Sequence, residues 1–172
     1  MKQLCIFLFF CLIFAAKLQA QDIYDACRKG NVGLIRKLYT LNNDTINKPN
    51  KSGYTPLIIA GYRNQLEAVK ALLELGANVN MMSEDGTVLT AACYKSNNEL
   101  VKILLSHKAD VNVKNNAGTT PLMFAIMAEN EEVVKMLIKH GADLNAKDNS
   151  NKSIIEFAQN CDNLAIKQLI VK

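Results

Sequence analysis

Residues 53–57 have the sequence GYTPL, and they decide the fold because the pattern recurs along the chain. It returns as DGTVL at residues 85–89 and as GTTPL at residues 118–122, each time with an alanine three residues later. The equivalent threonines Thr55, Thr87 and Thr120 are separated by 32 and 33 residues. A constant period of this length is typical of a solenoid, in which each unit packs against its neighbours.

Two further segments repeat in phase with the first. One has the sequences VKALL at residues 69–73, VKILL at 101–105 and VKMLI at 134–138. The other has the sequences GANVN at 76–80, KADVN at 108–112 and GADLN at 141–145. The first pattern is apolar at helical spacing, and the second combines glycine with turn-forming Asn and Asp. Each unit is therefore predicted to hold two helices followed by a hairpin.

The ends of the helices can be predicted from single residues. Thr55 and Pro56 begin a first helix, since threonine caps free amides and proline has no N–H to leave unpaired. Gly76 and Gly141 stand where a second helix ends in a left-handed residue. Lys108 occupies that place in the third unit, where it should cost about 1 kcal/mol of backbone strain.

The three repeated segments resemble the ankyrin-repeat family over essentially all of residues 22–172. The resemblance implies an all-α repeat solenoid, a stack of helix-turn-helix units with β-hairpin-like connecting loops. We expect one domain at residues 21–172, with capping units at both ends because these depart from the pattern. The five units are expected near 22–47, 48–80, 81–112, 113–145 and 146–172.

Residues 1–20 are predicted to be a secretory signal peptide. A basic start that includes Lys2 precedes an apolar run from Leu4 to Ala16, and small Ala20 ends the segment. The run is shorter than the roughly 20 residues that cross a bilayer, so an uncleaved anchor is the weaker alternative. The sequence thus predicts an exported bacterial protein, periplasmic or secreted, with no membrane contact after cleavage.

Charge and composition narrow the class of partner. The whole chain has 20 basic and 16 acidic residues, a formal net charge of +4. Removal of Lys2 and Lys17 with the signal peptide would leave +2. A balance this mild does not favour a nucleic-acid or lipid surface. We expect a monomer whose partner is another protein.

Residues with catalytic or metal-binding chemistry do not form a recognisable site. Cys27 and Cys93 share one repeat position two units apart, about 20 Å at roughly 10 Å per helix layer, too far for a disulfide. With Cys161, they are expected to be small buried residues of first helices. His107 and His140 share a position at the ends of second helices, where a cation is favoured. No nucleophile arrangement or phosphate loop is found, so we expect no catalysis, metal or cofactor.

The resemblance implies that binding is the function and that the concave side is the site. In the family, the two residues after the small pair of each first helix project onto that side, and the hairpins flank it. The corresponding positions here are Arg28, Lys29, Tyr62, Arg63, Tyr94, Lys95, Met127 and Ala128, with Lys51, Tyr54, Glu84, Asp85, Asn115, Asn116 and Lys152 on the hairpins. Tyrosine and arginine are enriched at binding hot spots. The alternative is that these residues are ordinary solvated positions.

Three functions therefore remain open from the sequence. The leading hypothesis is a non-catalytic protein–protein interaction module that acts outside the cytoplasm. A secreted effector or a toxin-neutralising, immunity-like binding protein is the alternative, which differs in destination and target. An enzyme or cofactor carrier is a distant third.

Overall fold

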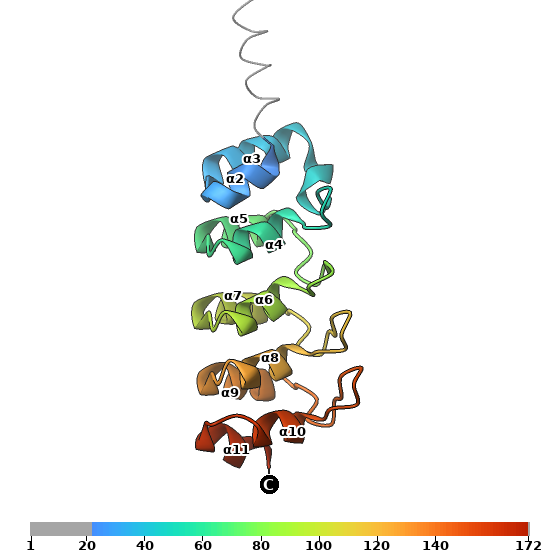
Figure 1. The fold of residues 1–172 in the computed structure, drawn as a ribbon. Coiled ribbons are helices and arrows are strands. Elements are labelled where there is room, and N and C mark those ends of the chain that lie inside the picture. The colour runs from blue at the N-terminus through green and yellow to red at the C-terminus, as the bar shows by residue number, and fades with distance from the viewer. Residues whose placement is uncertain (1–21, 172) are drawn as a thin grey trace, which may run out of the picture.

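The computed structural model describes residues 22–171, and the predicted signal peptide lies outside these residues. The helices stack as five pairs along one axis (Figure 1). The first helices of the pairs are α2 (Ile23–Lys29), α4 (Pro56–Tyr62), α6 (Val88–Tyr94), α8 (Pro121–Met127) and α10 (Ile154–Gln159). The second helices are α3 (Val32–Leu41), α5 (Leu66–Glu74), α7 (Asn98–Ser106), α9 (Glu131–Lys139) and α11 (Leu164–Ile170), and a short 3-10 helix, η1 (Asn43–Ile46), follows α3. The predicted all-α repeat solenoid is confirmed.

The first helices begin where the sequence predicts. The side chain of Thr55 accepts a hydrogen bond from the backbone N–H of Ile58, and Thr120 does the same for Met123. Thr87 caps α6 without a following proline, and Ser153 caps α10. Each cap pairs an amide that the first helical turn would otherwise leave unsatisfied.

The core is a continuous row of small and branched residues that runs through the stack. Ala60, Ala92, Ala125 and Ala158 are all essentially buried at equivalent positions of the first helices. Leucines of the second helices, among them Leu72, lie against them. Small alanines let successive helices approach closely, and α6 packs against both α4 and α8 as a result. Each pair therefore buries its apolar face against its neighbours rather than by itself.

Left-handed backbone occurs at the predicted places and at others. Gly76 and Gly141 have φ angles of 90° and 87°, and Lys108 takes the same role with φ 61°. The sequence did not predict the turns inside the pairs, where Asn64, Ser96 and Glu129 have φ angles of 56°, 54° and 52°. Gly30 holds this position in the first pair, and it is the residue type that accepts such a φ without strain.

The pairs are connected by four loops that project from one side of the stack (Figure 1). We call them fingers one to four, residues 48–54, 81–86, 113–119 and 146–152. In fingers one, three and four an Asn or Asp side chain accepts two N–H groups of its own loop, as Asn50 does from Ser52 and Tyr54. Isolated bridges occur at Ser83–Gly86 and Lys147–Ser153, without regular strands in residues 22–171.

Asparagines at the base of the first three fingers connect each of the first three units to the next. The side-chain oxygen of Asn47 accepts from the N–H of Asn78 at 2.7 Å, and that of Asn80 accepts from Asp110 at 2.8 Å. Asn112 continues this ladder by accepting from the N–H of Asp143 at 2.8 Å. The ladder sets the spacing of consecutive fingers by direct hydrogen bonds.

The three cysteines of the described chain are free and buried. Cys27 lies in α2 and Cys93 in α6, at the predicted position. The placement of Cys161 in a first helix is wrong, because it lies in the turn after α10. There its thiol faces the main-chain oxygen of Ala158 at 3.1 Å, which that turn brings close.

Candidate functional site

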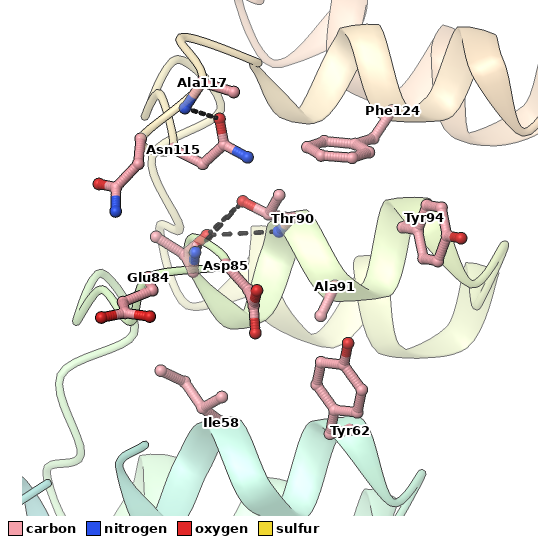
Figure 2. A pocket seen from close by; sticks show the side chains of 12 residues that line it. Ile58, Tyr62, Glu84, Asp85, Thr90, Ala91, Tyr94, Asn115, Ala117 and Phe124 are labelled. Atoms are coloured by element: carbon pink, nitrogen blue, oxygen red, sulfur yellow. Dashed lines mark hydrogen bonds between the residues drawn. The ribbon is translucent and has the colours of Figure 1, made fainter. Parts of the chain in front are cut away.

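A groove runs between the fingers and the outer ends of the first helices. At its centre lies a hollow of about 310 Å³, formed by residues of α4, α6, α8 and of fingers two and three (Figure 2). We call it the central hollow. Its lining consists of Ile58, Tyr62, Glu84, Asp85, Thr87, Thr90, Ala91, Tyr94, Asn115, Asn116, Ala117 and Phe124.

The floor of the central hollow is apolar or internally satisfied. Ile58, Thr87 and Thr90 are each at most 3% exposed. The two threonine hydroxyls lie 3.1 Å apart, and the Thr90 hydroxyl also accepts from the N–H of Thr87. These hydroxyls already have partners, so the floor contributes shape more than hydrogen bonding.

Aromatic rings form one wall. Tyr62 and Tyr94 remain 42% and 63% exposed, although both are large enough to gain from burial. Tyr94 packs edge-on against Phe124 with ring centroids 5.9 Å apart and an interplanar angle of 85°. The ammonium of Lys95 lies 4.0 Å from the centre of the Tyr62 ring and donates to the main-chain oxygen of Tyr62 at 2.9 Å. The rings are therefore positioned by contacts while their surfaces stay accessible.

Acidic side chains form the opposite wall, on finger two (Figure 2). Asp85 accepts a hydrogen bond from the hydroxyl of Tyr54 at 2.5 Å, and Tyr54 belongs to finger one. This hydrogen bond, together with the charge of Asp85, raises the pKa of the Tyr54 phenol. Glu84 is exposed and makes no hydrogen bond or ion pair within the described chain.

Two further hollows extend the groove on either side of Tyr62. One, of about 240 Å³, is lined by Arg28, Tyr54, Ile58, Tyr62 and Arg63, with Asn50 and Ile59. The other, of about 610 Å³, is lined by Tyr62, Arg63 and Lys95 together with Asn64, Ser96, Asn97 and Asn98. Tyr62 lines all three hollows, so the groove is continuous from the first pair to the fourth.

Many of the residues predicted from the sequence do gather in this groove. Tyr62, Glu84, Asp85, Tyr94, Asn115 and Asn116 line the central hollow, and Arg28, Tyr54, Arg63 and Lys95 line its two neighbours.

Five predicted residues lie apart from the central hollow and its two neighbours, namely Lys29, Lys51, Met127, Ala128 and Lys152. Lys29 forms an ion pair with Asp25 at 2.8 Å, and Lys51 lines a separate hollow around finger one. Met127 is 48% exposed at the end of α8.

Sequence reasoning missed the residues one helical turn before the predicted pairs. Ile58 precedes Tyr62 by four residues, and Phe124 precedes Met127 by three, so each lies on the same face of its helix. Thr90 and Ala91 stand in the same relation to Tyr94. This spacing was the signal that could have found them.

The potential metal-ligating side chains of residues 22–171 do not gather in one place. No cluster of three His, Cys, Asp or Glu residues that could hold a metal ion occurs there. The Nδ1 atom of His107 lies 2.9 Å from the main-chain oxygen of Ile103, and that of His140 lies 2.7 Å from the main-chain oxygen of Met136. In both cases the oxygen belongs to the preceding helical turn. Across the same residues, no helix is long and apolar enough to cross a bilayer.

Comparison with known proteins bears directly on the repeats. A family model described as ankyrin repeats (3 copies) matches residues 23–83 and 80–148, more than half of the chain. The human protein named DNA-binding protein RFXANK is 29% identical over 70 residues. That match covers 41% of this chain and 27% of the human protein, so the chain spans about a quarter of that relative's length. Together with the stacked helix pairs and the fingers, the match to the family shows that this chain belongs to the ankyrin-repeat family.

Proposed function

We propose that the protein is a non-catalytic binding module that holds another protein in the groove between its first helices and its fingers. The observation that carries the proposal is the exposure of Tyr62 and Tyr94 in one continuous groove. Large aromatic side chains that line a concave surface and remain exposed are characteristic of binding sites. Ankyrin repeats are typically interaction modules, which agrees with this use of the surface.

A protein fits the groove better than a nucleic acid does. Basic Arg63 and Lys95 lie beside Tyr62, whereas acidic Glu84 and Asp85 face it from finger two. A phosphate backbone would be attracted by the first two side chains and repelled by the other two. The name of the human relative refers to DNA, but the match covers only about a quarter of that protein.

We further propose that the protein acts outside the cytoplasm, in the periplasm or after secretion. The support is the composition of residues 1–20, with a basic start and a short apolar run, which is typical of a signal peptide. A secreted effector or an immunity-like partner of a toxin would use the same groove on a different target. Cell fractionation with an antibody against the chain separates a periplasmic from a fully secreted protein, and recovery in the cytoplasm alone contradicts export.

The binding proposal is tested by crosslinking in the native host, followed by capture of the crosslinked partner. The double variant Tyr62→Ala/Tyr94→Ala should weaken binding of the captured partner by roughly 2 kcal/mol or more, since exposed aromatics of this kind behave as hot spots. Thermal unfolding of the variant checks that the stack is still folded.

The matched controls are the alanine variants of Lys70, Lys102 and Lys135. They lie on the second helices, and each has a side chain that is at least 42% exposed and paired with a glutamate. These variants should bind the partner like the unchanged protein. Loss of binding in the lysine variants, with unchanged binding in the tyrosine variant, would show that the groove is not the site.

A further inference from the structure

We infer that the central hollow receives a basic side chain, an arginine or a lysine, from the bound protein. This inference rests on the proposed function and adds the chemistry of the contact. It is supported by the charge of the hollow, the arrangement of its rings and the apolar floor.

The charge of the central hollow is negative and locally uncompensated. Glu84 and Asp85 are the charged side chains among its lining residues. Asp85 is paired with a phenol rather than with a cation, and Glu84 has no counter-ion in the described part of the chain. An incoming ammonium or guanidinium group would supply the missing charge.

Among the fingers, this acidic pair belongs to finger two. Counted back from the helix caps Thr55, Thr87, Thr120 and Ser153, the positions equivalent to Glu84 are Ser52, Ala117 and Ser150, and those equivalent to Asp85 are Gly53, Gly118 and Asn151. The contact that we propose is therefore a single anchor point in the groove rather than a general property of the stack.

The aromatic wall suits a cation as well. A cation is attracted to the face of a tyrosine when it lies within about 6 Å of the ring centre. The Lys95 ammonium already lies 4.0 Å from the centre of the Tyr62 ring, so the incoming cation is expected at the ring of Tyr94. Lys95 does not line the central hollow, where the ring of Tyr94 is available as well.

The floor accounts for the rest of such a side chain. Ile58 and Ala91 are apolar, and the hydroxyls of Thr87 and Thr90 are occupied by each other. The methylene groups of lysine or arginine can lie on this floor while the charged end reaches the acidic wall. A neutral polar side chain would find no open partner on the floor, and an acidic one would be repelled by Glu84.

The experiment uses capped tripeptides as probes and the purified protein labelled for NMR. Gly-Arg-Gly is compared with Gly-citrulline-Gly, which has nearly the same shape without the charge, and Gly-Lys-Gly is compared with its acetyl-lysine form. The charged probes should give saturable shifts at the amides of Thr90, Ala91 and Tyr94. Their affinity should exceed that of the neutral probes by roughly 2- to 5-fold, the size expected for an exposed ion pair, and should fall with added salt.

The variant Glu84→Gln removes the open charge with little change of shape. It should reduce the difference between charged and neutral probes, whereas Glu99→Gln on α7, also exposed but away from the groove, should not.

Equal binding of arginine and citrulline probes, tighter binding of Gly-Leu-Gly, or no shift with any probe would overturn this inference. The proposed function is judged separately, by capture of the native partner with the tyrosine double variant, so each can fail alone.

Discussion

The hydroxyl of Tyr54 donates a hydrogen bond of 2.5 Å to Oδ2 of Asp85 and thereby ties finger one to finger two. Because the phenol donates to a carboxylate, loss of its proton would place two negative charges side by side. The pKa of Tyr54 is consequently raised above 10.0, and the hydrogen bond persists below that pKa and is lost as the pH rises through it. We predict that Asp85→Asn lowers the pKa of Tyr54 toward its ordinary value.

An alkaline ultraviolet titration measures this shift, and the variant Tyr54→Phe identifies the Tyr54 transition among those of the other tyrosines. Glu84→Gln serves as the control, since the charge of Glu84 is the smallest contribution to the raised pKa of Tyr54. If the two variants shift the transition equally, the hydrogen bond to Asp85 is not its main cause.

The sequence predicts the stack well because its signals are local and repeated. The threonine cap, the buried alanine and the left-handed residue at the end of the second helix each act within a few residues, and each recurs in phase. The central hollow is different, because Phe124, Thr90 and Ile58 come from three consecutive first helices. Whether these residues come close together depends on how the units stack, and the sequence of one unit does not determine that. The contact between the Lys95 ammonium and the Tyr62 ring likewise joins two units.

Lys108 provides a direct test of backbone strain. Its φ of 61° costs a non-glycine residue roughly 1–2 kcal/mol, and glycine loses about 0.4–1 kcal/mol more conformational entropy on folding. The difference predicts that Lys108→Gly raises the free energy of unfolding by about 0.5–1 kcal/mol. Urea denaturation measures the change.

The converse substitution is Gly141→Ala, at the same position one unit later. A Cβ atom there would have no neighbour within 4 Å, so the effect comes from the backbone φ of 87° alone. We expect a loss of about 1 kcal/mol. A stabilised Gly141→Ala protein would contradict the assignment of strain to this position.

Burial of the cysteine thiols predicts a loss of stability at alkaline pH. Burial, with a smaller contribution from the charge of Asp22, raises the pKa of Cys27 from 9.0 to about 12, and burial also raises that of Cys93. Above pH 9.0 the unfolded chain releases these protons while the folded chain keeps them. By linkage, the free energy of unfolding should fall as the pH rises from about 9 toward 12.

The variant Cys27→Ala/Cys93→Ala should show a shallower decline over this range, measured by urea denaturation at several pH values. Lysines and tyrosines also titrate there, and they contribute equally to both proteins. Alkylation followed by mass measurement adds a second readout: without reductant, the unfolded protein should react at Cys27, Cys93 and Cys161, and the folded protein slowly. An unchanged pH slope in the double variant would show that the thiols are not its source.

The asparagine ladder can be tested against an internal control, because Asn145 of the last unit holds the ladder position without making the ladder hydrogen bonds. Asn112 accepts from the N–H of Asp143 at 2.8 Å and donates to the main-chain oxygen of Gly141 at 3.0 Å. Asn112→Ala leaves both main-chain groups without this partner and should lower the free energy of unfolding by about 1 kcal/mol. Asn145 holds the same position one unit later, but its side chain has no hydrogen bond in the described chain. Asn145→Ala should therefore leave urea denaturation nearly unchanged, and equal losses in the two variants would mean that the side chains act on their own turns and not between units.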